Sequence, residues 1–190
     1  MKNSYLKEAW LLIVLGALFG AALAGVHAGL SPRIAANRLN DTLSQIPTLV
    51  PGAERGEAIE QGGRLVYRAL NAAGETVGWV VPSVGQGFSD RIEVLIGLDR
   101  DARTITGLYV LWQNDTPGLG NRITEPEFRG RFAGQTAERP LRMVKGAGGP
   151  GEIEAVTGAT VSSQSVVAIV NDAVARFREE RARENREERR

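Results

Sequence analysis

The sequence predicts an α+β protein in which one N-terminal transmembrane helix precedes a single domain of antiparallel sheet and packed helices. Three observations support this class. An uncharged apolar run lies near the N-terminus, strand-like runs alternate with turn residues in the middle, and apolar residues recur at helical spacing near the C-terminus. A chain of 190 residues is long enough for one domain and an additional segment, but not for two full domains.

Composition excludes several classes of function. The chain has no cysteine, which excludes disulfide frameworks, cysteine-ligated clusters and cysteine nucleophiles. Its one histidine, His27, lies in the most apolar stretch, so a Ser-His-Asp triad or a histidine metal site in the remainder is excluded. A net charge of +1 and the lack of a basic stripe give no reason to expect a nucleic-acid partner. We therefore expect no catalytic side chain and no metal site, and chemistry that depends on a bound cofactor.

The N-terminal segment is predicted to anchor the chain in a lipid bilayer. Residues 9–31, "AWLLIVLGALFGAALAGVHAGLS", contain no Asp, Glu, Lys or Arg, and about 20 apolar residues suffice to cross a bilayer core. Trp10 lies at the start of this run, where aromatic rings favour the interface. Residues 1–8 are then the cytoplasmic N-terminus.

A cleaved signal peptide is the alternative for this segment. Lys2 and Lys7 give it a basic start, and small residues surround positions 26–28. We favour the uncleaved anchor because the apolar run exceeds an ordinary signal-peptide core. Charge does not fix its orientation, because Arg33 and Arg38 balance the two lysines.

Residues 32–60 are interpreted as a short juxtamembrane helix and a linker. Ser31 is expected to cap the helix, Pro32 to occupy its first position, and Pro47 to end it. The stretch "TLVPGAERGE", residues 48–57, is expected to be a linker into the main domain.

Residues 61–178 are predicted to form the main domain. Two hairpins, a short helix, a further strand and a long helix are expected in order, at residues 64–70 with 76–81, 91–98 with 104–113, 125–134, 141–145 and 166–177. Residues 82–90 form a glycine-bearing loop between the hairpins. The charged tail, residues 179–190, is expected to be a solvated extension of the last helix or a frayed end.

Small residues and hydroxyls gather in "TGATVSS", residues 157–163, just before the last helix. Gly158 and Ala159 would let a ligand approach the backbone, and the helix N-terminus that follows favours an anion such as phosphate. The threonine hydroxyls offer hydrogen bonds and an ester-forming oxygen. The alternative is a simple helix cap with Ser162 or Ser163 as the N-cap residue.

A second motif, "NDTPGLGNRI", follows the strongest predicted strand at residues 114–123. Gly118 and Gly120 would let its backbone approach a flat ligand, and Leu119 would offer an apolar contact. Without further information the motif is equally typical of a tight turn.

Together these residues carry a resemblance to a known family. The order of an anchor, "GQGFSDRIEVLIGLD", "TITGLYVLWQNDTPGLG" and "EAVTGAT" before a helix is similar to the G subunit of Rnf electron-transport complexes. It is also similar to the C subunit of the sodium-translocating NADH:quinone reductase, and both belong to the FMN-binding domain family. The resemblance covers residues 8–178.

The resemblance implies FMN joined by a phosphoester to the last threonine of the motif, Thr160. Thr157, Gly158 and Ala159 complete the attachment motif. A separate Mg²⁺-dependent flavin transferase would install the group from FAD. The positions that match the family's flavin-contacting turn are Thr116, Gly118, Leu119 and Gly120.

Two positions depart from the family's pattern. Glu154 stands where the family favours aspartate, six residues before the acceptor threonine, and is expected to serve in recognition by the transferase. Asp115 stands where the family favours glutamate. Both changes keep the charge and alter the side chain by one methylene.

The implied function is that of a membrane-anchored flavoprotein that relays electrons within an Rnf-type complex. Such complexes couple electron transfer between ferredoxin and NAD to transport of Na⁺ or H⁺. The resemblance implies a single-pass protein of the bacterial inner membrane with its domain on the extracytoplasmic side, acting with other subunits. The alternatives are a C-subunit-like component, a flavin domain for another extracytoplasmic reductase, and a non-redox anchored assembly module.

Overall fold

The computed structural model describes residues 4–187. Lys2 and the last three residues of the charged tail lie outside the described residues. The chain forms two compact units, residues 1–41 and residues 42–190, and each is considered by itself.

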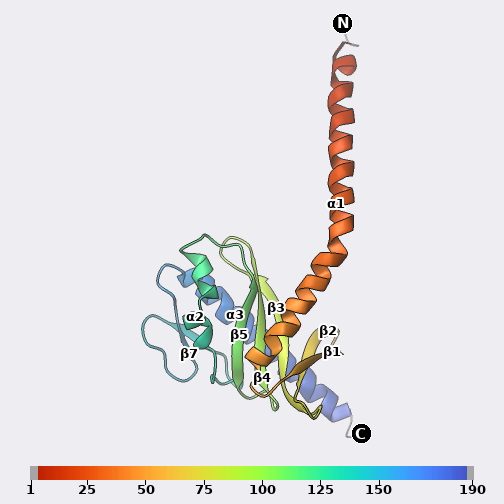
Figure 1. Ribbon diagram of the computed structural model, residues 1–190. Helices are drawn as coiled ribbons and strands as arrows, with labels where there is room; N and C mark the ends of the chain where they lie inside the picture. The colour runs from red at the N-terminus through yellow and green to blue at the C-terminus, as the bar shows by residue number, and fades with distance from the viewer. Residues whose placement is uncertain (1–3, 188–190) are drawn as a thin grey trace. The chain divides into compact units, whose positions relative to one another are not determined.

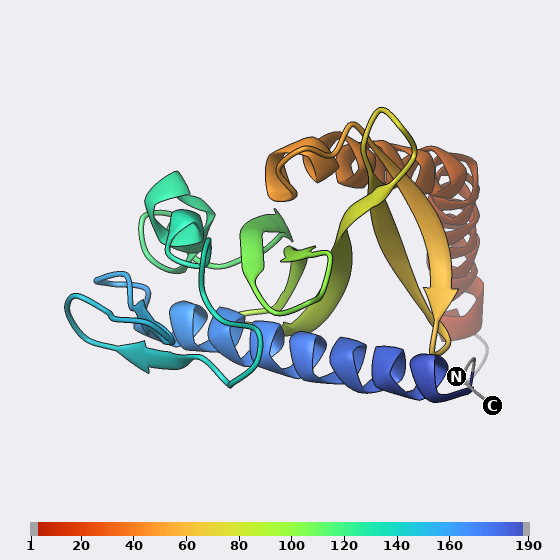
Figure 2. The same cartoon turned by 90° about the horizontal axis from the view of Figure 1, so that it is seen from below.

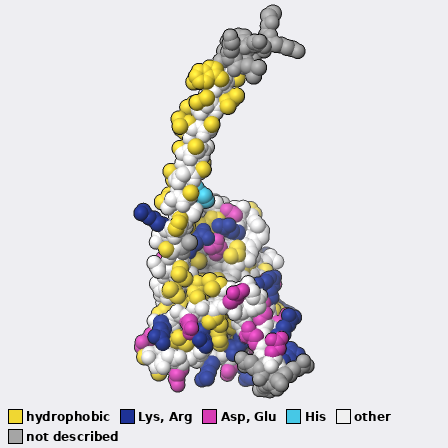
Figure 3. Space-filling view, turned by 90° about the vertical axis from the view of Figure 1, so that its right-hand side faces the viewer, with side chains coloured by type: hydrophobic (Ala, Val, Ile, Leu, Met, Phe, Trp, Pro, Cys, Tyr) yellow, Lys and Arg dark blue, Asp and Glu magenta, His cyan; other side chains and the backbone are white. Residues whose placement is uncertain are grey.

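The first unit consists of most of helix α1, which spans Ser4–Leu49. The segment Ala9–Leu49 contains an 18-residue window of mean hydropathy 2.3 that is not buried in the protein, so it is long and apolar enough to cross a membrane. Figure 3 shows hydrophobic side chains along the part of this helix that is not drawn in grey.

The separate juxtamembrane helix expected after Ser31 is not observed, because α1 continues through Pro32 and Pro47 as far as Leu49. The Ser31 hydroxyl donates to the His27 carbonyl oxygen at 2.7 Å, one turn back. Ser31 is therefore an internal helix residue and not an N-cap. A serine hydroxyl that bonds within its own helix is a common use of this side chain in apolar segments.

The second unit is built on a five-stranded antiparallel sheet in the order of the sequence (Figure 1). Its strands are β1 (Arg55–Gln61), β2 (Arg64–Leu70), β3 (Thr76–Gln86), β4 (Arg91–Asp99) and β5 (Ile105–Trp112). The two predicted hairpins are confirmed as β2–β3 and β4–β5. Strand β1 falls within the range expected to hold the juxtamembrane helix and linker.

Strand β3 is longer than predicted and includes residues 82–86, which were expected to be loop. Pro82 pairs with Leu95 of β4, whereas the pairing of β3 with β2 ends at Val80. Proline has no N–H to donate, so it fits a strand where one side is unpaired. The true loop between β3 and β4 is therefore residues 87–90.

The sheet buries both of its faces. Helix α3 (Thr160–Glu187) covers one face over a core that includes Ile92, Val94, Val166, Val170 and Phe177. The end of α1, from Thr42 onward, covers the other face (Figure 2). The smaller core on this side is formed by Ile46, Leu49, Val50, Ala53, Tyr67, Ala69, Val80 and Leu95.

A glycine allows the end of α1 to approach the sheet backbone closely. The Leu49 carbonyl oxygen accepts a hydrogen bond from the Thr106 hydroxyl at 2.6 Å. A Cβ at Gly97 would lie 2.5 Å from that oxygen, which is closer than any side chain can come. The last turn of α1 is thus fitted to the sheet by hydrogen bonding and by packing.

Short elements connect the sheet to α3. They are the 3₁₀ helix η1 (Gly120–Thr124), helix α2 (Pro126–Gly130) and the parallel strands β6 (Arg142–Val144) and β7 (Glu152–Glu154). Helix α2 and β6 were predicted, whereas η1 and β7 were not. Strand β7 has only three residues, too few for a period-2 pattern to identify it.

Candidate cofactor site

The two motifs singled out in the sequence lie against each other in the second unit. The turn Thr116–Gly120 follows β5, and Thr157–Ala159 lead into α3. A Cβ at Gly158 would lie 3.4 Å from Leu119 Cδ2, which is van der Waals contact. Gly158 has φ +85° and Gly118 has φ +75°, a conformation in which glycine is strongly preferred. The fold therefore brings all the predicted cofactor-binding positions into one region.

A buried carboxylate joins these motifs. Asp115 is 5% exposed, and its Oδ2 accepts a hydrogen bond from Ser162 Oγ at 2.6 Å. Its Oδ1 accepts the Ser89 N–H at 2.9 Å, which adds the β3–β4 loop to the assembly. Hydrogen bonds to an ionised acceptor are about twice as strong as neutral ones, so Asp115 fixes three segments.

Gly120 makes room for this arrangement. A Cβ at position 120 would lie 2.6 Å from Asp115 Cβ and 2.7 Å from Ser162 Oγ. The glycine predicted to let a ligand approach the backbone instead packs against the Asp115–Ser162 hydrogen bond. Its direct structural role is therefore to let η1 begin beside α3.

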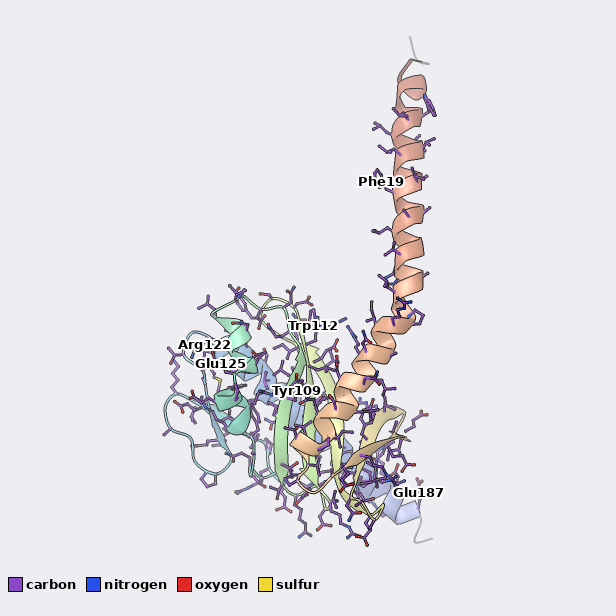
Figure 4. All side chains as sticks on the ribbon, in the orientation of Figure 1. Phe19, Tyr109, Trp112, Arg122, Glu125 and Glu187 are labelled. Atoms are coloured by element: carbon purple, nitrogen blue, oxygen red, sulfur yellow. The ribbon has the colours of Figure 1, made fainter. Side chains whose placement is uncertain are left out.

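An arginine that no pattern in the sequence singles out holds the loop before α3, residues 155–159. Arg122, in η1, donates from Nη1 to the Thr157 carbonyl oxygen at 2.7 Å. Its Nε donates to Glu125 Oε1 at 3.0 Å, and the two labelled side chains lie together in Figure 4. The hydrogen bond to Glu125, and then the charge of Glu125, raise the pKa of the Arg122 guanidinium.

Helix α3 begins at Thr160 without a capping side chain. The Ala159 carbonyl oxygen accepts the Ser163 N–H at 2.8 Å, which is the first bond of the helix, so Ala159 is the N-cap residue. Alanine has no side-chain oxygen to satisfy the first N–H groups, and it ranks low at this position.

The alternative, in which Ser162 or Ser163 caps the helix, is wrong. Both lie inside the first turn and are buried. Ser162 donates to Asp115, and Ser163 Oγ accepts the Val156 N–H at 3.2 Å. Their hydroxyls thus hold the surrounding loops instead of the helix terminus.

The start of α3 leaves backbone N–H groups without acceptors at the position predicted to carry a phosphate. Within the described residues, the N–H groups of Thr160, Val161 and Ser162 have no hydrogen-bond acceptor. The Thr160 hydroxyl also has no hydrogen-bond partner there, and its side chain is half-buried. Unpaired N–H groups at a helix N-terminus suit a phosphate. The residues present therefore fit a phosphoester at Thr160.

Apolar side chains are exposed around the same point. Leu119 is 52% exposed and Val161 is 54% exposed. Val161 also lines a groove of about 460 Å³ that runs between the end of β3 and the first turns of α3, with Val84, Gly85, Gln164 and Ala168 among its walls. These side chains give an apolar surface that suits a flat aromatic ring.

Glu154, expected to serve in recognition, lies at the end of β7. Arg131 Nη1 donates to the Glu154 carbonyl oxygen at 2.7 Å and lies 3.8 Å from its carboxylate. No sequence signal identifies Arg122, Arg131 or Ser89 as site residues. The groups through which they join separate segments, in Thr157, Glu154 and Asp115, lie 35, 23 and 26 positions away. Among the described residues, no group of three or more His, Cys, Asp or Glu side chains could hold a metal ion.

A match to a known protein family shows the class of protein to which the second unit belongs. Residues 87–175 match the family described as the FMN-binding domain. This range contains both motifs and most of the elements that position them, so the second unit contains an FMN-binding domain.

Longer relatives define the particular family. The chain is 30% identical to the G subunit of the ion-translocating oxidoreductase complex of Methanosarcina acetivorans, over 86% of this chain and 89% of that protein. It is also 30% identical to the G subunit of the proton-translocating ferredoxin:NAD⁺ oxidoreductase complex of Clostridium ljungdahlii, over 82% of each chain. The chain therefore belongs to the family of G subunits of ion-translocating oxidoreductase (Rnf) complexes.

Solved structures show the related fold. The structure of NqrC from Shewanella oneidensis is similar with a TM-score of 0.53 and 27% identity, over 56% of this chain and 53% of that one. The C subunit of the Na⁺-translocating NADH-quinone reductase from Parabacteroides distasonis gives the same TM-score at 20% identity, over 67% of this chain and 76% of that one. The second likeness supports the fold alone.

Proposed function

We propose that Thr160 carries FMN through a phosphoester to its hydroxyl oxygen. One observation supports this most directly: a hydroxyl without a hydrogen-bond partner among the described residues stands at the uncapped start of α3, beside three open N–H groups. A phosphoester there would receive hydrogen bonds from the backbone and favourable interaction with the helix dipole.

The modification is a transfer from FAD by a separate flavin transferase with Mg²⁺. The Thr160 oxygen attacks the flavin-side phosphorus of the pyrophosphate, and the bond from that phosphorus to the bridging oxygen breaks. AMP leaves, and the hydroxyl proton passes to the transferase or to solvent. Glu154 is proposed to lie on the surface that the transferase recognises, since its carboxylate is partly exposed next to the loop.

Once attached, FMN supplies reversible one- and two-electron redox chemistry. The chain itself binds and orients the group. The turn Thr116–Gly120 and the motif Thr157–Ala159 are proposed to contact it, with Leu119 providing an apolar surface. The buried Asp115–Ser162 hydrogen bond keeps these two contact regions in register.

The physiological role that fits best is an electron relay within an Rnf complex. The relative from Clostridium ljungdahlii is named as the G subunit of a proton-translocating ferredoxin:NAD⁺ oxidoreductase complex. The relative from Acetobacterium woodii, 36% identical over 53% of this chain and 49% of its own length, is named for Na⁺ translocation. We propose electron transfer between ferredoxin and NAD, coupled to Na⁺ or H⁺ transport by the whole complex.

The apolar segment of α1 is proposed to anchor the chain as a single-pass protein of the bacterial inner membrane, with the FMN-binding domain on the extracytoplasmic side. In that position a covalent link prevents loss of the flavin. The partners are then the other subunits of the complex and the lipid bilayer.

Fluorescence on a denaturing gel tests the attachment. The full chain is produced together with a flavin transferase, denatured and examined for flavin fluorescence and for the intact mass. We expect a fluorescent wild-type band, no signal from Thr160→Val, and an unchanged signal from Thr124→Val, which removes an exposed hydroxyl outside both motifs. A wild-type chain of unmodified mass would refute covalent attachment, and a labelled Thr160→Val chain would refute its position.

A further inference from the structure

We call residues 154–159, which lead from β7 to Thr160, the attachment loop. Two arginines from one short segment of the chain bond to this loop at two points. Arg122 Nη1 donates to the Thr157 carbonyl oxygen at 2.7 Å. Arg131 Nη1 donates to the Glu154 carbonyl oxygen, also at 2.7 Å. These two carbonyl groups belong to the residues three and six positions before Thr160. Residues 120–131 therefore bond to the strand-to-helix connection at two separate points.

Each arginine is itself held by a carboxylate. Glu125 accepts from Arg122 Nε at 3.0 Å and from Nη2 at 3.4 Å, so this pair has the two-point geometry of a guanidinium and a carboxylate. Glu127 accepts from Arg131 Nη2 at 2.6 Å. Because the guanidinium is planar and rigid, a carboxylate bonded to one side of it fixes where Nη1 lies. In both arginines Nη1 is the atom that donates to the loop carbonyl oxygen.

The backbone between these points is also fixed. The Val156 N–H donates to Ser163 Oγ at 3.2 Å, and the Val156 carbonyl oxygen accepts the Ala159 N–H at 2.9 Å. The Val156 side chain is buried. The loop is thus held before any cofactor is attached, while Thr160 at its end keeps a hydroxyl without a partner among the described residues.

The arginines also balance negative charge at this site. A cavity of about 170 Å³ beside the loop is lined by Arg122, Arg131, Glu125, Glu127, Glu154 and Thr157. Without the two arginines, three carboxylates would face the approach of a phosphate to the neighbouring helix terminus. These carboxylates would repel the negatively charged phosphate, because like charges repel one another.

From these contacts we propose that Arg122 and Arg131 are positioning residues for flavin attachment. They hold the segment Glu154–Thr157 in the conformation in which Thr160 is presented to the transferase. This role rests on the proposed function, because it concerns the rate of attachment at Thr160. Neither arginine is expected to contact the reacting phosphorus.

Timed labelling of the full-length chain tests the proposal. The unlabelled protein in detergent micelles is incubated with transferase, FAD and Mg²⁺, and flavin incorporation is followed by gel fluorescence and intact mass. We expect Arg122→Gln and Arg131→Gln each to be labelled roughly tenfold more slowly, a factor that corresponds to about 1.4 kcal/mol. Arg176→Gln is the matched control, because Arg176 is exposed further along α3 and, among the residues that the structure describes, its side chain bonds to Asp172 alone.

Three further measurements separate positioning from general destabilisation. Amide hydrogen exchange of the unlabelled variants is expected to become faster in residues 155–161 and to stay unchanged in the sheet, with the midpoint of thermal unfolding within a few degrees of wild type. Arg122→Lys keeps the charge but lacks the planar guanidinium that bonds to both oxygens of Glu125 while it donates to the Thr157 carbonyl oxygen, so we expect its labelling rate to be below that of wild type.

The outcomes are distinct. Wild-type labelling together with equally fast labelling of Arg122→Gln and Arg131→Gln would overturn the positioning role alone. Faster exchange throughout the domain, or a wild-type rate for Arg122→Lys, would also overturn it. A wild-type chain that takes up no flavin would overturn the proposed function and this role with it.

Discussion

Asp115 and Ser162 form a buried hydrogen bond of 2.6 Å between the turn after β5 and the first turn of α3. It connects the two motifs singled out in the sequence, and the two residues are separated by about a quarter of the chain. The carboxylate also accepts the Ser89 N–H. The stability of the whole site should therefore depend on this pair.

Replacing Ser162 with alanine should destabilise the domain by about 1.5–3 kcal/mol, the usual value of a hydrogen bond to a charged group. The reason is that one oxygen of a buried carboxylate loses its partner. Chemical denaturation of the unlabelled protein measures the free energy of unfolding. Ser165→Ala, in the next turn and only half-buried, serves as the control, and equal stability of the two variants would contradict this account.

Gly120→Ala should be more harmful than Gly118→Ala, although both glycines belong to the same turn. The added Cβ at position 120 would lie 2.6 Å from Asp115 Cβ, whereas nothing lies within 4 Å at position 118. Overpacking of this kind costs about 1–3 kcal/mol. At position 118 the cost arises from φ +75° alone and is about 1 kcal/mol. The comparison uses the free energy of unfolding, and the reverse order would show that backbone strain dominates.

The FMN-binding domain should fold without residues 1–41 of the apolar N-terminal segment only if the end of α1 is retained. A fragment of residues 42–190 keeps Ile46, Leu49 and Val50, which cover the second core. A fragment of residues 51–190 removes them, and each such side chain contributes about 1.5–3 kcal/mol when buried. We expect the first fragment to be monodisperse on size exclusion and the second to aggregate. Equal behaviour would show that this core is dispensable.

Tyr67 should make the domain less stable at alkaline pH. Burial raises the pKa of the Tyr67 hydroxyl, so the folded state keeps its proton at a pH where the unfolded state loses it. Stability is then unaffected below the ordinary pKa of about 10 and falls as the pH rises from there through the folded-state pKa. Tyr67→Phe should show a smaller decrease in thermal stability between neutral and alkaline pH. An identical decrease in both proteins would exclude Tyr67 as the cause.

Local patterns in the sequence predicted most of the secondary structure. Alternation and turn residues identified the two hairpins, and helical spacing of apolar residues identified α3. The short pieces were missed because β7 has three residues and η1 has five, lengths over which no period can be recognised. The helix start predicted at Ser31 was wrong because serine and proline also occur inside long apolar helices, where Ser31 bonds one turn back.

The sequence by itself determined the class of protein, the apolar anchor segment and the two motifs, because these depend on neighbouring residues. The tertiary structure alone decided how the motifs are joined. It paired Asp115 with Ser162, directed Arg122 to the Thr157 carbonyl oxygen, and left the start of α3 with a cap that lacks a side-chain acceptor. Such partners come together only when the chain folds back over tens of residues, and spacing along the sequence carries no information about which donor will meet which acceptor.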